Sequence, residues 1–438
     1  MTEVSRTYET AMVAVLGLMV GVMAFEQTSL FFLLPFIKRE MALTNSQAGL
    51  LGTVYFVAFA LSSWLAGPLA DRGRGRKAAL IVIIAATSLF SVLSAAVHSY
   101  ASLFAVRLLM GLLEGPVLPL AQSILALESP AKRRALNMGI VGSLIGNLFG
   151  GLIAPLTLIH LASSHGWRAG FLLVAAPGLV SAALAALILH QPSGQPVADE
   201  VSAPAPQNGM FNVLALTNVW QCACIGCCFA AYLSVGIAFI PLFYSTGGDL
   251  TPGEIALLMS TAGISAITYS VIVPMASNWI GRRRAMVAAY SLGIIPPLAA
   301  ISCGGAIALL GPLMFFGWAI SGTGSLSYGT IPSESVDPSM LSRAIGLIVA
   351  LGTLGGGLLG PTIAGWSADV WGPRAPLLVM VTIGVTGALI SLCLTETAPK
   401  RIQQRRSPQA PASPANPLFR EVFDGRRSQA APRHIKEM

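Results

Sequence analysis

The stretch GPLADRGRGRK at residues 67–77 is a dense group of charges between two long apolar runs. It holds one acid, four basic residues and three glycines, and each flanking run has the roughly 20 residues that a helix needs to cross a bilayer. A related stretch, PMASNWIGRRR at 274–284, follows another apolar run. Basic residues in short loops mark the cytoplasmic side of membrane proteins. The two stretches therefore predict an α-helical protein that crosses the membrane repeatedly.

Apolar stretches of this length continue along the whole chain. Hydrophobic residues make up 54% and charged residues only 10% of the sequence, against about 25% charged residues in soluble domains. The alternation typical of a lipid-facing β-barrel is absent. We predict an all-α membrane protein with twelve transmembrane helices, at 11–37, 46–70, 78–98, 102–127, 136–161, 169–190, 213–244, 254–279, 285–305, 307–331, 342–368 and 375–396.

Internal similarity divides the chain into two pseudo-symmetric halves of six helices each. LTNSQAGLL (43–51) matches LTPGEIALL (250–258) at an offset of 207, and GGLIAP (150–155) matches GGLLGP (356–361) at an offset of 206. Repeats of this kind are one known plan for transporters, with the substrate site between them. We predict a first half at 1–190, a Pro/Ser/Ala-rich cytoplasmic linker at 191–211, a second half at 212–396 and a disordered basic cytoplasmic tail at 397–438.

The distribution of Lys and Arg predicts the orientation. Loops after the second, fourth, eighth and tenth stretches carry eleven basic residues, whereas the opposite loops carry only Lys38, Arg39, Arg168 and Arg374. Both termini are therefore expected in the cytoplasm. The net charge of +8 requires no nucleic-acid partner, because nine basic residues lie in the tail.

Three charged residues fall deep inside the predicted helices, all in the first half: Glu26, Arg107 and Glu114. Such residues are costly in a bilayer and are functional candidates by default. Arg107 and Glu114 are seven positions apart, so they share a helix face about 10 Å apart. Arg107 is a permanent cation suited to a carboxylate, and a carboxyl removed from water favours its protonated form. Either acid could bind a coupled proton; the alternative is a charge cluster that only fixes helix packing.

The loop at 67–77 resembles the signature loop of the major facilitator superfamily, with one extra residue between Asp71 and Gly75. The positions that fit are Gly67, Leu69, Asp71, Arg72, Gly75, Arg76 and Lys77. In the second-half copy Asn278 replaces the acid. Contacts between such an acid and a basic cluster can form in one arrangement of the halves and break in another. We therefore interpret Gly67, Asp71, Arg72, Gly75 and Arg76 as a conformational latch, with a pure topology signal as the alternative.

The helix containing RLLMGLLEGPVLP (107–119), together with residues 36–61, resembles the anion:cation symporter branch of that superfamily. The resemblance implies import of organic anions with protons. It makes Arg107 the substrate-linked arginine, Glu114 the proton-linked acid and Glu26 the acid of the first helix. Many members carry arginine where this chain has Gln27. The replacement removes one cation from the expected site, so we expect a less polar monocarboxylate as substrate.

The main alternative function is that of a proton-driven exporter of drugs or metabolites. Residues 142–151 help to distinguish the two functions. Exporters resemble one another in a Gly-x-x-x-Gly-Pro-x-x-Gly-Gly element, and this chain keeps the glycines but has Asn147 at the proline. The exporter interpretation is weakened but stays open. Asn147 is a candidate substrate contact, or a residue that ties helices together.

The second half lacks buried charge, so aromatic and hydroxyl groups are expected to shape its side of the site. The candidates for substrate contact are Tyr55, Tyr232, Trp318 and Tyr328, with packing or interfacial anchoring as the alternative. The cysteines of CACIGCC (222–228) lack accompanying His or acids and are interpreted as packing residues, so no metal is expected. No nucleotide-binding loop and no nucleophile–base group are present.

These observations predict a secondary transporter for uptake of a small organic anion with protons. The protein is expected to be a multi-pass monomer of the inner (plasma) membrane, without cofactor and without enzymatic activity.

Overall fold

The computed structural model describes residues 6–71, 75–190, 217–247, 249–336 and 341–398, without the side chains at 64–71, 131–132, 135, 143 and 341–343. This part of the chain contains no β-strand. Twelve of its helical segments are long and apolar enough to cross a membrane, which confirms the predicted all-α fold. Residues 1–398 form one compact unit. The linker predicted at 191–211 and the tail beyond residue 398 lie outside the described residues.

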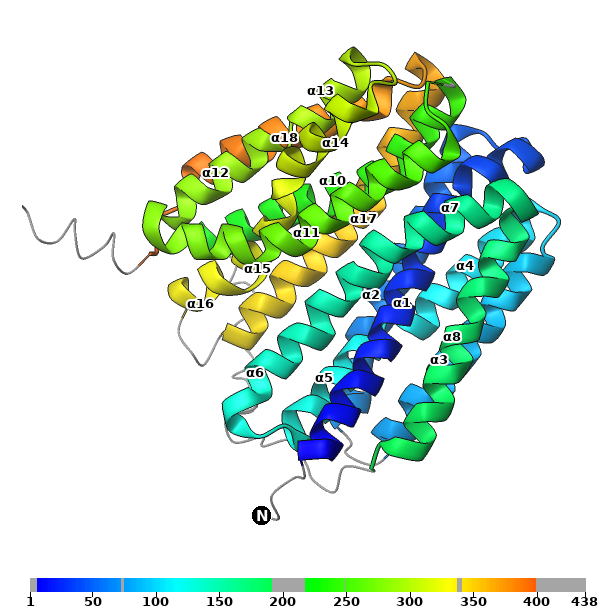
Figure 1. Cartoon of the computed structure of the whole chain (residues 1–438). Helices are drawn as coiled ribbons and strands as arrows, with labels where there is room; N and C mark the ends of the chain where they lie inside the picture. The colour runs from blue at the N-terminus through cyan, green and yellow to red at the C-terminus, as the bar shows by residue number, and fades with distance from the viewer. Residues whose placement is uncertain (1–5, 72–74, 191–216, 248, 337–340, 399–438) are drawn as a thin grey trace, which may run out of the picture. The chain divides into compact units, whose positions relative to one another are not determined.

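The first six spans are built from eight α-helices and two π-helical segments (Figure 1). These are α1 (Arg6–Met41), α2 (Asn45–Asp71), α3 (Arg76–Ala96), α4 (Tyr100–Glu114), α5 (Val117–Glu128), α6 (Ala131–Gly139), the π-helices η1 (Ile140–Leu144) and η2 (Asn147–Ile153), α7 (Ala154–His165) and α8 (Trp167–Ile188). Two predicted spans therefore contain irregular helix: the fourth is broken between α4 and α5, and the fifth runs from α6 through η1 and η2 to α7.

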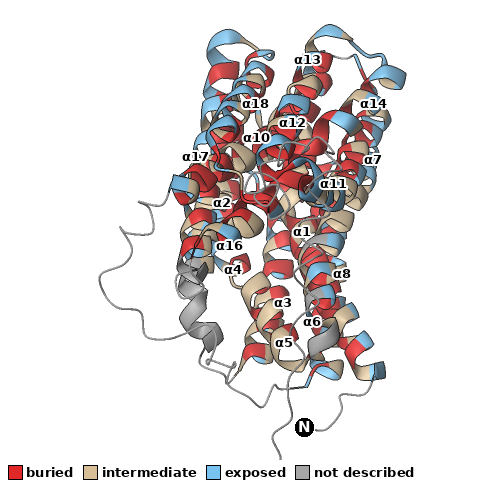
Figure 2. Ribbon diagram, turned by 90° about the vertical axis from the view of Figure 1, so that its left-hand side faces the viewer, coloured by how far each residue is buried: buried red, intermediate tan, exposed pale blue. Residues whose placement is uncertain are grey.

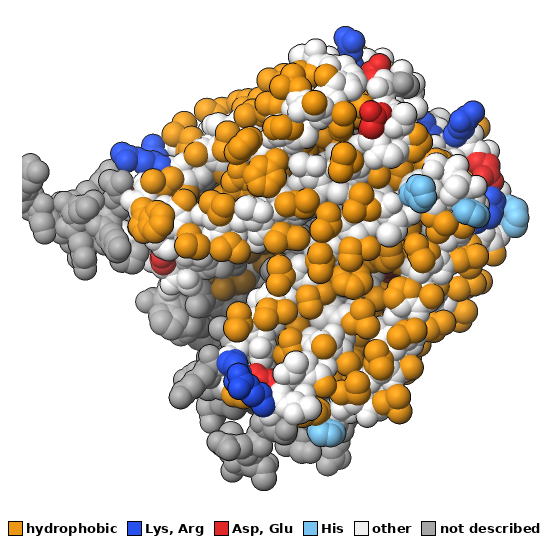
Figure 3. Space-filling view, in the orientation of Figure 1, with side chains coloured by type: hydrophobic (Ala, Val, Ile, Leu, Met, Phe, Trp, Pro, Cys, Tyr) orange, Lys and Arg blue, Asp and Glu red, His pale blue; other side chains and the backbone are white. Residues whose placement is uncertain are grey.

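The second six spans follow the same order with breaks at other places. They comprise α10 (Thr217–Gly247), α11 (Pro252–Ile280), α12 (Arg282–Leu292), α13 (Ile295–Ser302), α14 (Ile307–Gly317), the 3₁₀-helix η3 (Trp318–Gly322), α15 (Thr323–Ser325), the π-helix η4 (Leu326–Thr330), α16 (Ile331–Ser335), α17 (Leu341–Trp371) and α18 (Ala375–Cys393). On the face seen in Figure 3 hydrophobic side chains cover most of the helices, and the charged side chains gather towards the ends. This is the surface expected of a bilayer-spanning bundle.

The matching motifs of the two halves adopt matching local structures. Thr44 and Gln47 exchange backbone-to-side-chain hydrogen bonds of 3.0 and 3.1 Å at the start of α2. Thr251 and Glu254 form the same reciprocal capping box at the start of α11, with bonds of 2.8 and 3.3 Å. A capping box satisfies backbone N–H groups that a helix start leaves without partners, so each copy of the motif fixes where the second span of its half begins.

The two charged loops also end alike. Gly75 precedes α3 with φ 94°, and Gly281 precedes α12 with φ 100°. A positive φ is strained for a residue with a Cβ atom and is readily adopted by glycine. The two glycines are separated by the repeat offset of 206. They therefore form the same backbone turn in each half, which supports the internal repeat.

The halves meet along helices that pack at very short distances. α1 and α10 are the most buried of the twelve spans: 61% of the residues in an 18-residue apolar stretch of each are buried (Figure 2). α2 packs on α17, and η2 and α7 pack on α11. A Cβ atom on Gly49 would lie 2.3 Å from the carbonyl oxygen of Pro361, and one on Gly263 would lie 2.1 Å from that of Gly151. Side chains larger than hydrogen are therefore excluded from both crossings.

Polar contacts join the halves at the end where α1 ends and α2 begins, here called the paired end. Asp369 of α17 accepts hydrogen bonds from the backbone N–H groups of Asn45 (2.8 Å) and Ser46 (2.7 Å) and from the Ser46 hydroxyl (2.5 Å). At the opposite end the ion pairs between described side chains stay within one half: Arg133 with Glu9, and Arg282 with Glu334. The halves are thus tied at one end and separately braced at the other.

Only part of the predicted latch can be located. Gly67 and Asp71 belong to the last turns of α2, whose side chains are not described, and Arg72 lies outside the described residues. Gly75 and Arg76 start α3, and the Arg76 side chain is buried, with 1% exposed.

The second-half counterpart of the latch loop is fully described. The Arg282 guanidinium donates to Glu334 at 2.8 and 3.2 Å, and its backbone N–H donates to Glu396 at 2.8 Å. The Thr397 hydroxyl also donates to Glu334, at 2.6 Å. These bonds hold the start of α12 to the end of α16 and to the chain after α18.

Replacing Asp369 with Ala should loosen the paired end, because three hydrogen bonds between the halves lose their acceptor. Their loss at an exposed position is expected to cost about 1 kcal/mol, so the amides of residues 42–48 should exchange with deuterium roughly fivefold faster. Hydrogen-exchange mass spectrometry of the purified protein measures this. Glu254→Gln is the matched control, since the bonds of that acid stay within its own helix cap; equal exchange in both variants would contradict the role of Asp369.

Candidate functional site

The helix that carries Arg107 and Glu114 ends at the second of these residues. α4 begins with a capping box between Ser99 and Ser102 and stops at Glu114, and α5 starts at Val117. Between them lie Gly115 and Pro116, and proline lacks the N–H that a continuous helix would use. Broken helices inside membranes are found where the backbone is buried in protein or lines a site. The break therefore lies directly beside a buried carboxyl group.

Two glycines bring α4 into backbone contact with α2. A Cβ atom on Gly111 would lie 2.4 Å from the carbonyl oxygen of Tyr55, and one on Gly115 would lie 2.1 Å from the Ser62 hydroxyl. The small-xxx-small spacing of these glycines is the usual basis of such close approach. As a result the Tyr55 hydroxyl donates a hydrogen bond to Oε2 of Glu114.

Arg107 is removed from water and is stacked on an aromatic ring. Its side chain is buried, with 1% of the residue exposed, and its guanidinium carbon lies 4.7 Å from the ring centroid of Phe171 on α8. This is the geometry of a cation–π contact. Nε and Nη2 of Arg107 make no hydrogen bond within the described chain. The ring thus holds the arginine while leaving donors unused.

The two acids lie close enough to act electrostatically on Arg107. Neither forms an ion pair with it in the part of the chain that the structure describes. Both carboxylate oxygens of Glu26 and Oε1 of Glu114 are buried without a hydrogen-bond partner there; the nearby Ser91 hydroxyl donates instead to the carbonyl of Phe171 at 2.9 Å. Buried polar atoms are nearly always hydrogen-bonded in native proteins. The unused atoms of Glu26, Arg107 and Glu114 therefore mark a candidate binding site.

Two amides belong to the packed pair of helices that includes Glu26: Gln27 on α1 and Asn147 on η2 of the fifth span. A Cβ atom on Gly150 would lie 2.8 Å from the carbonyl oxygen of Ala24, so η2 packs tightly on α1 just before Glu26 and Gln27. Asn147 is the first residue of η2, and π-helical turns occur frequently at functional sites. Gln27 and Asn147 are half-buried, and neither side chain makes a hydrogen bond with the described residues.

The two tyrosine candidates of the second half, unlike Tyr55, donate their hydroxyl hydrogen bonds to backbone carbonyls of their own half. The Tyr232 hydroxyl donates to the backbone carbonyl of Gly293 at 2.6 Å, and its ring packs on Trp318 with 5.6 Å between centroids. Tyr328 is half-buried on η4 and donates to the carbonyl of Gly226 at 3.1 Å. The structure therefore groups Tyr55, Glu26, Arg107 and Glu114 together, and it places Tyr232 and Trp318 within the packing of the second half.

Sequence reasoning missed Phe171, which follows no motif and becomes a partner of Arg107 only through tertiary packing. The spacing of Gly111 and Gly115 was a signal that could have located the α2–α4 contact. The cysteines at 222, 224, 227 and 228 are free. Within the described residues no group of three or more His, Cys, Asp or Glu side chains is arranged to hold a metal ion.

Comparison with known proteins identifies the family. The profile of the Major Facilitator Superfamily matches residues 16–358 and 250–428. The chain belongs to this superfamily. The described residues contain twelve helices long and apolar enough to span a membrane, and the superfamily is one of transporters and not of enzymes.

Similar members of the superfamily differ in how much of the chain they match. The hexuronate transporter of Bacillus subtilis (strain 168) is 30% identical over 159 residues, which is 36% of this chain and 37% of that protein. The sialic acid transporter of Escherichia coli (strain K12) is 27% identical over 84% of this chain and 89% of its own. The chain therefore spans little more than a third of the first relative and most of the second.

A solved structure shows the same fold. The bacterial homologue of the human lysosomal transporter Spinster, in an inward-facing and unoccupied conformation, superposes with a TM-score of 0.71. The superposition covers 93% of this chain and 100% of that chain at 19% identity. At this identity the likeness supports the superfamily fold alone.

Replacing Gly111 with Ala should destabilise the transporter, because the new methyl group overlaps the backbone of α2. Overpacking of this kind costs about 1–3 kcal/mol, and the melting temperature of the purified protein should fall by several degrees. Gly311→Ala on α14 is the matched control: its Cβ would meet nothing within 4 Å, so helix propensity alone should leave the melting temperature unchanged or higher. Equal shifts for the two variants would argue against close α2–α4 packing.

Proposed function

We propose that this transporter takes up a small organic anion together with protons, by alternating access between its two halves. The observation that carries the proposal is the buried group of Glu26 on the first span and Arg107 and Glu114 on the fourth, whose side chains retain unused polar atoms. The names of two relatives, transporters of hexuronate and of sialic acid, denote organic acids. A buried cation beside two acids is suited to such a substrate.

Arg107 is proposed to bind the carboxylate of the substrate. Its guanidinium presents donors in a fixed fork that matches a carboxylate, and two of its nitrogens have no partner in the described chain. Gln27 and Asn147 supply amides on the neighbouring spans, and Tyr328 supplies an aromatic surface from the second half. A single cation with neutral partners favours a monocarboxylate over a more highly charged anion. Tyr232 and Trp318 are proposed to support that wall of the site by their mutual packing.

Glu114 and Glu26 are proposed to exchange the coupled proton. While either acid is ionised, its negative charge competes with a substrate anion for electrostatic attraction to Arg107. Protonation removes that competition and lowers the charge that the site carries through the membrane. Tyr55 fixes one oxygen of Glu114, which leaves the other for the proton or for substrate.

Alternating access is proposed to separate the paired end and to close the opposite end. By the positive-inside rule we propose that the opposite end and both termini lie in the cytoplasm of an inner-membrane protein, and that the described arrangement is closed at the outer side. The latch residues Gly67, Asp71, Arg72, Gly75 and Arg76 are proposed to act at that end in the first half, as Arg282 and Glu334 brace it in the second. A monomer contains every residue that this proposal uses.

Arg107→Lys should fold normally but take up carboxylates roughly tenfold or more slowly, because an ammonium cannot reproduce two parallel hydrogen bonds. The assay uses purified protein in liposomes that contain a pH-sensitive dye, with aliphatic, aromatic and sugar carboxylates and lipophilic cations added one at a time. Acidification of the lumen by a carboxylate class, weakened in Arg107→Lys but not in the exposed control Arg374→Lys, is expected. Proton movement in the opposite direction, with cations only, would establish the exporter alternative.

Glu114→Gln should abolish accumulation driven by a proton gradient while leaving exchange between equal substrate pools, because an amide cannot release a proton. Tyr55→Phe, which removes only the hydroxyl bound to Glu114, should shift the pH dependence of uptake without abolishing it. Uptake and exchange of the substrate found above are measured in parallel in the same liposomes. Full accumulation by Glu114→Gln would transfer the proton role to Glu26, which Glu26→Gln then tests.

A further inference from the structure

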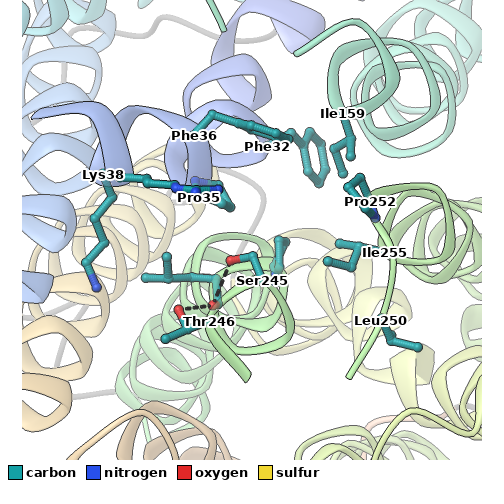
Figure 4. Close-up of a pocket in the computed structure, with 13 residues that line it drawn as sticks. Phe32, Pro35, Phe36, Lys38, Ile159, Ser245, Thr246, Leu250, Pro252 and Ile255 are labelled. Atoms are coloured by element: carbon teal, nitrogen blue, oxygen red, sulfur yellow. Dashed lines mark hydrogen bonds between the residues drawn. The ribbon is translucent and has the colours of Figure 1, made fainter. Parts of the chain in front are cut away.

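A cavity of about 420 Å³ lies at the paired end, between helices of both halves (Figure 4). The first half contributes α1 and α7, and the second half contributes α10, α11 and the turn between them. The lining residues used below are Phe32, Phe36, Lys38, Arg39, Ser245 and Thr246. None of the residues of the Arg107 site lines it.

The inner wall of the cavity is apolar. Phe32 is 2% exposed, and Figure 4 shows its ring directed towards Ile159 and Pro252. Ser245 and Thr246 lie at the exposed side, but their hydroxyls turn back to their own helix and donate to the carbonyl of Leu242 at 2.9 and 2.8 Å. These hydroxyls therefore do not give the cavity free hydrogen-bond donors. The walls are suited to a ring or a short hydrocarbon chain.

The charged members of the lining are both cations. Lys38 donates one hydrogen bond to Asn45, which leaves further ammonium hydrogens. Arg39 is exposed and makes no hydrogen bond or ion pair within the described residues. No acid lines the cavity; the nearby Asp369 is engaged by the backbone of α2. An apolar pocket with cations on one side is complementary to an amphipathic anion.

We propose that this cavity is a binding site for a small water-soluble organic carboxylate, separate from the Arg107 site. The apolar part of the ligand packs on Phe32 and Phe36, and the carboxylate faces Arg39 and Lys38. The volume falls in the range of small-molecule sites, about 300–1,000 Å³. The proposal rests on the cavity alone and holds whether or not Arg107 binds a transported anion.

Occupation of the cavity has a conformational consequence. Because α1 and α7 belong to one half and α10 and α11 to the other, the complete pocket exists only while the paired end is closed. A ligand that binds one arrangement better shifts the population towards it. The bound carboxylate therefore stabilises the closed paired end and slows its opening.

Photolabelling with 4-benzoylbenzoate tests the proposal on the full-length protein in phosphatidylcholine nanodiscs. Peptides that contain residues 32–39 or 245–255 should be labelled, and the uncharged analogue 4-methylbenzophenone should label them several-fold less. Arg39→Gln should reduce labelling roughly threefold, as expected for one partly exposed charge. Ser245→Trp, which fills the cavity, should reduce it at least about tenfold. Arg374→Gln is the matched control, since that exposed arginine does not line the cavity, and should label like the unaltered protein.

Two further measurements distinguish the cavity from the Arg107 site and from a groove that binds lipid. Labelling of these peptides should persist in Arg107→Gln, so loss of transport in that variant and loss of the cavity site are distinguishable. Benzoate should compete with the label. Equal labelling by the uncharged analogue, no effect of Ser245→Trp, or competition by oleate but not by benzoate would each overturn the proposal; the last would mean that a lipid-derived acid occupies the cavity.

Discussion

Three charged side chains removed from water without an ion pair among them are the constraint around which the first half is organised. An ionised group at the centre of a bilayer costs on the order of 3 kcal/mol on insertion scales. The ring of Phe171 offsets part of the free-energy cost of burying Arg107, and the hydroxyl of Tyr55 offsets part of the cost of burying Glu114. Electrostatic attraction between Arg107 and the two acids offsets a further part of this cost. Even so, several polar atoms of the three side chains have no hydrogen-bond partner among the described residues. A cluster that served only to fix helix packing would be expected to pair those atoms, because a half-satisfied polar network is less stable than an apolar core.

The same glycine-dependent contacts that build this group also connect it to the interface between the halves. Gly150 and Gly151 are adjacent on η2, but Gly150 packs against Ala24 of α1 and Gly151 packs against Gly263 of α11. Adjacent residues of η2 therefore contact both the helix that carries Glu26 and a helix of the second half.

Repetition and local chemistry explain what could be predicted from the sequence. The twelve spans, the capping residues Thr44 and Thr251 and the turns at Gly75 and Gly281 depend on nearby residues, and the repeat offset shows each one twice. Glu26, Arg107 and Glu114 could be singled out because charge in an apolar run is rare. Phe171 as a partner of Arg107, and Asp369 as an acceptor for the start of α2, arise from residues more than sixty positions apart that packing brings together. No periodicity or spacing encodes such pairs, and the internal hydrogen bond of Tyr232 is of the same kind.

The paired end shows why the two halves can separate at modest cost. Its hydrogen bonds to Asp369 lie at an exposed position, where each contributes on the order of 1 kcal/mol or less, and its closest helix contacts are between glycines and backbone. Moving a two-state equilibrium from 1:99 to 99:1 takes about 5.5 kcal/mol of differential binding. In the proposed mechanism, protonation of a buried acid and binding of an anion to Arg107 together supply the differential binding that separates the paired end.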